Sequence, residues 1–419
     1  MRRGIASRFG LPLTLTIVLL AARLAAVPSL TDAVTGTAPD SLRLSAPAAY
    51  LILAPLFTLW DGVSMLSMSR LEGFLAGLLV LYLGWRIWRI LTFRRGSLRR
   101  CWLREAGVLA ASVGLLLVFL LTGALWHRPM LSLVDVPPGE KVVDFHSHTS
   151  ASHDVTGTLM KHFDVPANLR WHRRAGFDAV FITDHNVVSR ESGGASNQSP
   201  VAGRRSQKAA GGTVLCPGIE VSAWRAHIVL LGDTLPVNRR VYNQNLQSLL
   251  QLLRTSKSAY GSLSVASLPE YRRNHWTRLD TLVGAGLDGF EIVNASPKAN
   301  ELTRAERDTV IALARAWDRF VVGVSDSHGW GATSMVWNLV PIQPYTASSD
   351  VCTAILDRLR NGFGAARVIE RHRLRPDAGW PMLLTPLGTL WESWRSMGWP
   401  LTLSWLFWIW LPWAFIRRR

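Results

Sequence analysis

Two histidines separated by a single residue, His146 and His148, stand at the end of a short apolar run that also contains Asp144. Alternate side chains of a β-strand point to the same face, so these three side chains would share one face. Two imidazoles with a nearby carboxylate form a common ligand set for zinc and similar ions. A lone histidine is more often structural, but this spacing, with Asp154 six residues after His148, predicts a metal site.

Four later segments place acids and imidazoles at the ends of apolar runs in the same way. Strand ends gather at one face of a barrel of alternating strands and helices, where sites are built. Mixed nitrogen and oxygen ligands suit Zn²⁺, Mn²⁺ or Fe²⁺. For Asp184 and Asp326, the alternative is that they cap helices that follow their strands. The residues in these segments are Asp184, His185, Glu220, His227, Asp326 and His328.

The segment 139–375 alternates short apolar runs with amphipathic stretches, which is typical of an α/β domain. The stretch 189–212 has no periodicity and many Gly and Ser residues, so it predicts a long loop. Helices are expected at 166–175, 238–254, 301–317 and 350–360. Strands are expected at 141–146, 178–183, 213–219, 227–232, 262–266, 289–293 and 320–325.

Apolar segments lie on both sides of this domain. A helix of about 20 apolar residues crosses the roughly 30 Å hydrocarbon core of a bilayer. The chain is therefore expected to have a membrane region at 1–138 with three or four transmembrane helices, a metallohydrolase domain at 139–375, and a linker with a last transmembrane helix at 376–419. The candidate spans are 11–27, 72–92, 107–126 and 397–416, together with 48–66, which Asp61 interrupts.

Positive charge indicates how these segments are oriented. The formal net charge is +17, and many arginines flank apolar segments, as between residues 86 and 104 and at Arg417 to Arg419. Basic flanks stay in the cytoplasm, which places the central domain outside it, at a bacterial inner membrane. A span at 48–66 would force the N-terminal arginines outside, so the sequence allows a count of either four or five spans. The domain lacks a clustered basic and aromatic stretch, so no nucleic acid is expected.

The cysteines add little to this interpretation. The chain has three, Cys101, Cys216 and Cys352, which are too few and too scattered for a disulfide framework or a Cys-ligated zinc site. They leave the redox compartment undecided.

Five segments in order resemble the motifs of the PHP (polymerase and histidinol phosphatase) superfamily. They read DFHSHTSASHD, FDAVFITDHN, PGIEVSAWRAHIVLLG, GFEIVNAS and GVSDSH, and they span about residues 141–330. The resemblance implies a distorted (β/α)7 barrel with two or three divalent metal ions and the hydrolysis of phosphoesters. The fold class expected for the whole chain is therefore an α/β barrel of the PHP type, flanked by transmembrane helices.

The resemblance also assigns roles to the ligand residues. His146, His148, Glu220 and Asp326 would hold one ion, and Glu220 would bridge to a second ion on the side of His227. Asp154, His185 and His328 would hold another ion. Asp154 or His185 would also handle the proton of the leaving group. Four basic residues near the expected metal face are candidates for binding a phosphate, although ordinary surface positions are an equal alternative for each. They are Arg225, Arg272, Arg273 and His275.

One position departs from the family pattern. Members of the superfamily have a His-Pro pair before the region of Glu291, whereas this chain has Leu268-Pro269. Leucine does not coordinate metals, so one ion position is lost or weakened, or a neighbour such as His275 substitutes.

The expected function is a metal-dependent phosphatase or phosphodiesterase that uses a metal-activated water on a phosphorylated small molecule or a lipid-linked substrate. Hydrolysis of C–N or carboxylic ester bonds is an alternative, because metal-water chemistry is not confined to phosphorus. A third hypothesis is a non-catalytic membrane module, which is supported by Leu268 in place of a metal-binding histidine.

Overall fold

The computed structural model describes residues 5–93, 98–188, 207–208, 212–232, 237–297, 302–331, 333–343, 347 and 350–416. The predicted loop at 189–212 lies mostly outside this part of the chain, as do the arginines at 417–419. Within that loop, the two residues of β6 (Gln207–Lys208) pair antiparallel with β7, so this piece is strand rather than loop.

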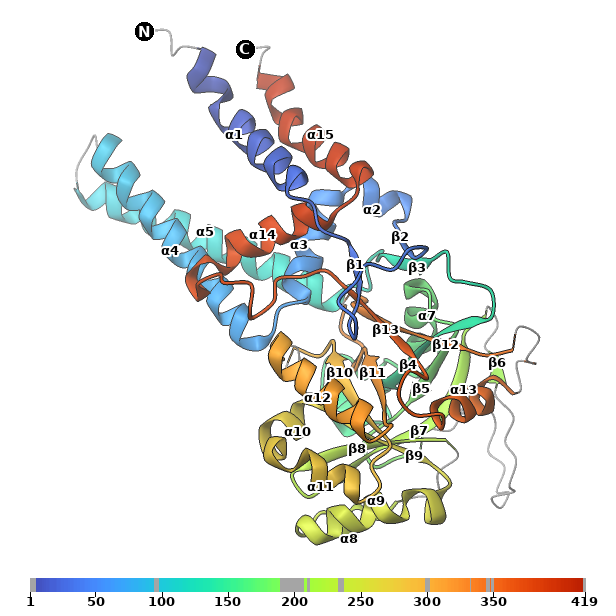
Figure 1. Ribbon diagram of the computed structural model, residues 1–419. Helices are drawn as coiled ribbons and strands as arrows, with labels where there is room; N and C mark the ends of the chain where they lie inside the picture. The colour runs from blue at the N-terminus through green and yellow to red at the C-terminus, as the bar shows by residue number, and fades with distance from the viewer. Residues whose placement is uncertain are drawn as a thin grey trace.

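The centre of the molecule is a curled, half-barrel sheet of eleven strands (Figure 1). The strand order is β1-β13-β12-β4-β5-β7-β8-β9-β10-β11, with β6 beside β7. The seven predicted strands are all present. They are β4 (Glu140–Ser147), β5 (Ala179–Ile182), β7 (Val214–Ala223), β8 (Ala226–Leu231), β9 (Leu263–Ala266), β10 (Gly289–Asn294) and β11 (Phe320–Val324). The strands not predicted are β1 (Leu30–Asp32), β12 (Val336–Pro341), β13 (Arg367–Arg371) and a separate pair, β2 (Arg43–Ser45) with β3 (Ser132–Val134).

The predicted α/β class is confirmed, but the sheet is mixed. Strands β4, β5 and β7 are parallel to one another, as are β9, β10 and β11, while β8 runs antiparallel between the two groups. The curl brings the first group to the last. The backbone N–H of Asp326 donates to the carbonyl of His146 at 2.9 Å, and that of His148 donates to Ser327 at 2.9 Å. The segments after β4 and β11 therefore meet.

Period-two alternation along β4 explains how the site is separated from the core. Val143 and Phe145 join one hydrophobic cluster, where Phe145 stacks on Phe181 with ring centroids 5.5 Å apart. The intervening side chains point to the opposite face, so His146 lies among polar groups instead. The same strand thus supplies both packing and ligands.

The helices of this domain begin and end at recognisable capping residues. Asp164 caps α7 (Val165–Ala175), which stops at the left-handed Gly176. Capping boxes open α9 (Leu246–Tyr260) and α12 (Arg304–Ala316). The predicted helix at 238–254 is divided in two, because α8 (Arg239–Tyr242) ends before Asn245 starts α9. The other helices here are α6 (His153–Thr156), α10 (Leu268–Asn274), α11 (Leu279–Gly284) and α13 (Val351–Leu359). Outside this domain, α14 (Thr385–Ser396) packs against α1, α3 and α4.

A disulfide joins Cys216 of β7 to Cys352 of α13, with the two Cα atoms 5.5 Å apart. The number and spacing of the cysteines did not predict this bond. The two residues are 136 positions apart, and only the packing of α13 on β7 brings them together.

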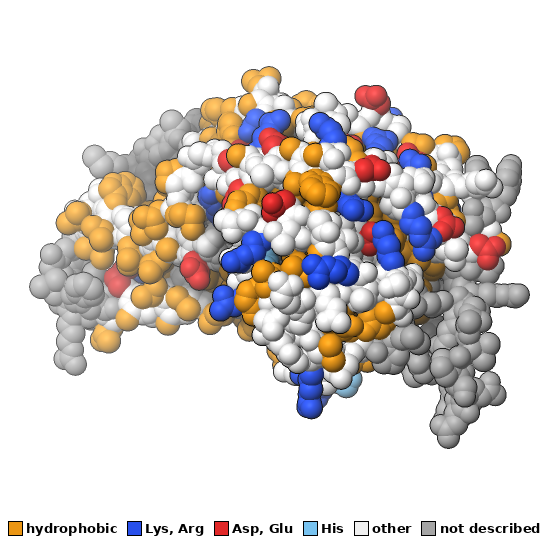
Figure 2. Space-filling model, turned by 60° about the horizontal axis from the view of Figure 1, so that its bottom comes forward, with side chains coloured by type: hydrophobic (Ala, Val, Ile, Leu, Met, Phe, Trp, Pro, Cys, Tyr) orange, Lys and Arg blue, Asp and Glu red, His pale blue; other side chains and the backbone are white. Residues whose placement is uncertain are grey.

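Four apolar helices extend away from the sheet (Figure 1). They are α1 (Ile5–Leu24), α4 (Met68–Phe93), α5 (Leu98–Leu125) and α15 (Trp399–Ile416). Among the described residues, Met68–Thr92 and Leu103–Leu125 are long and apolar enough to cross a membrane, and Phe9–Leu24 is a shorter apolar helix. Figure 2 shows hydrophobic side chains gathered on the side where α4 and α5 extend, while charged side chains are spread over the sheet domain.

The candidate span at 48–66 is not a continuous helix. It consists of α2 (Ala48–Ile52) and α3 (Ala54–Ser64), each too short to cross a bilayer. Asp61 lies fully buried inside the protein rather than in lipid. It accepts hydrogen bonds from Tyr50 at 2.7 Å, from Arg128 at 3.0 Å and from Arg371 at 2.7 Å. We call these four residues the Asp61 cluster; they join the N-terminal helices to β13.

Candidate metal centre

Three overlapping groups of His, Asp and Glu side chains converge near the ends of β4, β5 and β11 and on strands β7 and β8. Each group has its ligand atoms within 4.8 Å of one another, a spacing that could hold a metal ion. All eight residues expected to be ligands belong to these groups. The groups are His146, His148 and Asp326; His148, Asp154, His185 and His328; and His185, Glu220 and His227.

The inner group consists of His146, His148 and Asp326, and Glu220 of the third group approaches its two imidazoles. His146 Nε2 lies 3.0 Å from His148 Nε2 and 3.1 Å from Glu220 Oε2. Asp326 Oδ1 lies 3.1 Å from His148 Nε2 and 3.5 Å from His146 Nε2. Ligands about 2.1 Å from a tetrahedral ion stand roughly 3.4 Å from one another, so these spacings fit a zinc-sized cation.

The second group lies nearer the surface. His328 Nε2 is 2.8 Å from Asp154 Oδ2, and His185 Nε2 is 3.1 Å from the same oxygen. The ring of His148 stacks against His185 with centroids 4.9 Å apart and against His328 with centroids 4.4 Å apart. Asp154 is partly exposed, which leaves room for a ligand or substrate beside it.

Glu220 connects the inner group to the third. Its Oε2 faces His146, while its Oε1 lies 3.0 Å from Nδ1 of His227. Such a divided carboxylate has the geometry of a bridge between two cations. Beyond His227 stands Glu270, whose Oε2 is 3.8 Å from His227 Nδ1. That oxygen is buried and has no hydrogen-bond partner.

A further layer of polar residues orients the ligands. His146 Nδ1 lies 2.6 Å from Glu291 Oε1, which fixes its proton on Nδ1 and turns Nε2 toward the inner group. Asn294 donates to Glu291 at 2.9 Å and to Asp326 at 3.2 Å. The sequence reasoning gave Glu291 and Asn294 no role. The available signal was their place in GFEIVNAS, which ends an apolar strand as the other ligand segments do.

Two acids near the motifs belong to other contacts. Asp144, which period-two geometry places on the ligand face, binds His172 at 2.8 Å and the backbone N–H of Ser325 at 3.1 Å. Asp184 accepts the hydroxyl of Thr149 at 2.7 Å. These carboxylates tie the segments after β4, β5 and β11 together. Neither of them is in the three ligand groups.

The charges of the centre are strongly coupled. Burial alone would lower the pKa of His146, but Glu220, Asp326 and Glu291 together raise it well above its usual value. Burial opposes the charged form of Glu220 as well, yet His146 and His185 hold its pKa well below the usual range. The same competition raises the pKa of His227 to about 9, through Glu220. The carboxylates therefore favour the protonated forms of His146 and His227, whose positive charge offsets theirs.

The residues expected to bind phosphate are placed differently. Arg272 forms a forked ion pair with Glu306 of α12, at 2.9 Å, so its guanidinium is already occupied. The Nε2–H of buried His275 donates to the carbonyls of Trp224 and Arg225 at 3.2 and 3.1 Å. His275 therefore secures the turn between β7 and β8. In the described structure it is absent from the three ligand groups, so it does not substitute for Leu268.

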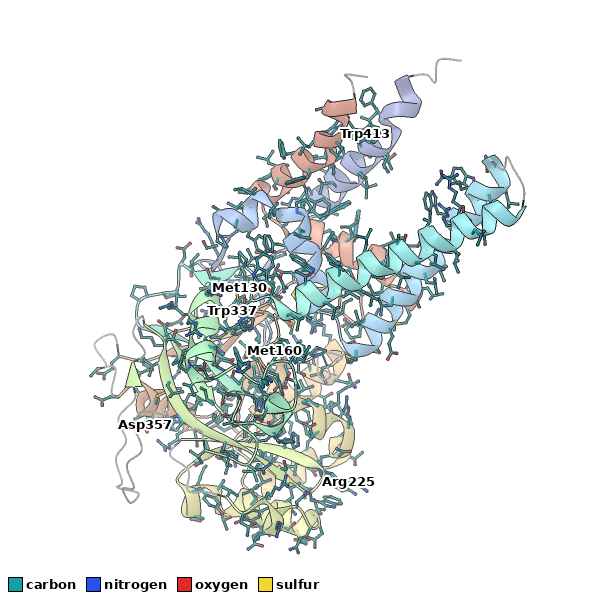
Figure 3. The ribbon with its side chains drawn as sticks, turned by 180° about the vertical axis from the view of Figure 1, so that it is seen from behind. Met130, Met160, Arg225, Trp337, Asp357 and Trp413 are labelled. Carbon is teal, nitrogen blue, oxygen red and sulfur yellow. A yellow bond between two sulfur atoms is a disulfide. The ribbon has the colours of Figure 1, made fainter. Side chains whose placement is uncertain are left out.

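Arg225 and Arg273 lie on the surface, where their proposed role stays a prediction. Arg225 occupies the turn after β7 and stacks over Trp224, 5.4 Å from the ring centroid (Figure 3). Leu268 is the first residue of α10 rather than a strand end, and its side chain packs in the main hydrophobic cluster. Its backbone N–H donates to Glu291 at 2.9 Å.

The loop that follows His328 is fixed by the end of α5. The N–H of Gly331 donates to the carbonyl of Ala124 at 2.7 Å, and His127 Nε2 donates to Gly329 at 2.6 Å. Arg128 also donates to the carbonyl of Gly331. A Cβ at position 331 would collide with carbonyl oxygens of Gly123 and Trp126, so the close approach requires glycine.

Comparisons with known proteins add little. No family model and no curated protein matches the chain. Among solved structures, the crystal structure of PsfC from Pseudomonas syringae is similar over 61% of this chain and 98% of its own, with 16% identity and a TM-score of 0.34. A likeness at that level carries no argument about fold or function.

Proposed function

We propose that this chain is a metal-dependent phosphoesterase, a phosphatase or phosphodiesterase. The observation that carries the proposal is the pair of buried imidazoles of His146 and His148, whose Nε2 atoms lie 3.0 Å apart. Each of these nitrogens lies 3.1–3.5 Å from an oxygen of Glu220 and from an oxygen of Asp326. Two imidazole nitrogens and two carboxylates at that distance have the donor types and the spacing of ligands to one divalent cation. The motif resemblance to the PHP superfamily and the curled sheet support this class, including its distorted barrel.

The side chains divide into positions for two ions, or three. The inner group would hold the first, and Glu220 would bridge toward a second held by His227. We assign Glu270 to that second position, because its buried Oε2 has no hydrogen-bond partner and faces His227. It would supply the ligand that Leu268 does not. Asp154, His185 and His328 would form the third position. The ligand set suits Zn²⁺, Mn²⁺ or Fe²⁺.

When bound, the ions would supply an activated water and neutralise charge on the phosphoryl oxygens. The protein's own residues would do the rest. Glu291 holds His146 in one tautomer, so its free nitrogen stays aimed at the centre. Asp154 is the most exposed carboxylate of the ligand groups. Burial opposes its charged form, but hydrogen bonds with His185 and His328 hold its pKa below the usual range. As a carboxylate it would orient His185, 3.1 Å away, and that imidazole would pass a proton to the leaving oxygen.

We also propose that four helices, α1, α4, α5 and α15, cross the inner membrane of a bacterium. With 48–66 removed as a span, the arginines at the N-terminus, at 86–104 and at 417–419 all face the cytoplasm. The sheet domain then lies outside. The Cys216–Cys352 disulfide supports that side, because such bonds persist in oxidising compartments.

Two experiments test these proposals. Purified full-length protein should hydrolyse a member of a phosphoester panel after loading with Zn²⁺ or Mn²⁺, and chelation should remove the activity. Preferential hydrolysis of amide or carboxylic ester substrates would contradict the phosphoesterase proposal and favour hydrolysis of C–N or carboxylic ester bonds. For topology, a periplasm-specific reporter fused at residue 250 should be active, whereas activity of a cytoplasm-only reporter there would contradict the orientation.

A further inference from the structure

The surroundings of α4 and α5 bear on the substrate. Only 17% of the Met68–Thr92 span and 6% of the Leu103–Leu125 span is buried inside the protein. A core helix of a water-soluble protein would be mostly buried, and a signal sequence would stand at the N-terminus. These helices are neither. Long apolar surfaces of this kind suit a lipid bilayer.

The end of α5 lies beside the metal centre. Gly331, which contacts the Ala124 carbonyl at 2.7 Å, is three residues from His328. Because successive Cα atoms are about 3.8 Å apart, His328 lies within roughly 15 Å of the end of that helix. The headgroup layer on one side of a bilayer is about 5–8 Å thick. If α5 spans the bilayer, the metal centre stands just above the headgroups.

Apolar side chains are exposed at this junction. Trp126 at the end of α5 is 44% exposed, Trp330 in the loop after His328 is 36% exposed, and Leu159 is 70% exposed. The Leu159 segment reaches the same place, because Phe163 packs against the ring of His127 with centroids 5.6 Å apart. Met160 of that segment lies below the end of α5 in Figure 3. Tryptophan is the residue that favours the membrane interface.

We propose that the substrate is a lipid-anchored phosphoester, whose acyl chains stay in the outer leaflet while its phosphate enters the metal centre. This inference rests on the proposed function. Hydrolysis would join the oxygen of water to phosphorus and break the bond to the lipid oxygen, which takes a proton. Trp330 and Leu159 would contact the apolar part of the lipid next to its headgroup.

The test uses full-length protein reconstituted in vesicles and loaded with Zn²⁺ or Mn²⁺. Phosphatidic acid in the vesicles is compared with glycerol phosphate and p-nitrophenyl phosphate in solution. We expect kcat/KM for phosphatidic acid to exceed that for glycerol phosphate. Trp330→Ala should lower the vesicle rate about tenfold, as the loss of one large apolar contact does, and leave the soluble rates unchanged. Trp317→Ala, which removes an exposed tryptophan after α12, is the matched control.

The outcomes separate this inference from the proposed function. Hydrolysis of glycerol phosphate as efficient as that of phosphatidic acid overturns the lipid anchor but keeps the phosphoesterase. Equal losses in Trp330→Ala and Trp317→Ala also overturn it. Metal-loaded protein that hydrolyses none of these three phosphomonoesters and no phosphodiester of the panel contradicts the proposed function itself.

Discussion

The metal centre and the Asp61 cluster both contain buried carboxylates, but different side chains contact those carboxylates. In the Asp61 cluster, one carboxylate receives two guanidinium groups and a phenol, so the protein supplies its own positive charge. In the metal centre, the contacts described for the ligand carboxylates come from imidazoles, hydroxyls and amides, with neither Lys nor Arg among them.

That contrast suggests different purposes. A cluster that carries its own cations is complete without a ligand and stabilises the contact of α2 and α3 with β13. A cluster of carboxylates whose described contacts are imidazoles, hydroxyls and amides is suited to bind a metal ion, which would displace any protons that the imidazoles hold. The distinction can be tested by disturbing each cluster and reading both stability and metal content.

The largest effect is expected from removing an inner ligand. His146→Ala or His148→Ala should reduce phosphoester hydrolysis to background while the domain stays folded, because each removes a nitrogen from the inner group. Turnover and circular dichroism of the full-length protein check this. Wild-type turnover at unchanged metal content would contradict the site.

In the Asp61 cluster the effect should fall on stability. Asp61→Asn leaves Arg128 and Arg371 buried beside a neutral amide, and breaking a buried ion pair costs about 3–5 kcal/mol. Thermal unfolding in detergent measures the loss. The fraction that remains folded should bind as much metal as wild type, and a matching fall in its metal content would erase the difference between the clusters.

The orienting layer should give an intermediate effect. Glu291→Gln keeps the shape but weakens the hold on His146 Nδ1, and outer hydrogen-bond partners of metal ligands typically contribute about 10–100-fold in affinity. Competition with a fluorescent chelator measures the change. If affinity is unchanged, Glu291 has only a structural role.

The smallest effect is expected at Glu270. Glu270→Gln should lower the affinity or occupancy of the second ion, although His227 and Glu220 remain. The inner ion should stay in place, because none of its ligands changes. Elemental analysis across a metal titration reports the number bound. Glu306→Gln on neighbouring α12, whose carboxylate pairs with Arg272, is the control and should bind the wild-type number. Identical binding by both variants would remove Glu270 from the ligand set.

Local sequence patterns predicted much of this arrangement. The period of two along β4 separates Phe145 from His146. Each other ligand segment lies at one end of an apolar run that is a strand in the structure, and His227 stands at the start of its run. The helix expected at 350–360 is also present, as α13 (Val351–Leu359). These features depend on neighbours in sequence, which is why pattern reasoning reaches them.

Features that depend on long-range packing were missed. The segment 48–66 looked like a weak span because its composition is apolar, but Asp61 is matched by Arg128 and Arg371, which lie far away in the chain. The Cys216–Cys352 bond also depends on long-range packing. So does the approach of Glu270, on α10, to His227. His275 was expected near the ligands, but carbonyl groups of the β7–β8 turn hold it elsewhere.

The most direct test of the central claim is the metal content of the purified full-length protein. After loading with Zn²⁺ or Mn²⁺ and removal of excess ion, elemental analysis should find at least two divalent ions per chain. The doubly substituted His146→Ala, His148→Ala protein should lose the inner ion and stay folded. Folded wild-type protein that retains no metal under these conditions would contradict the account.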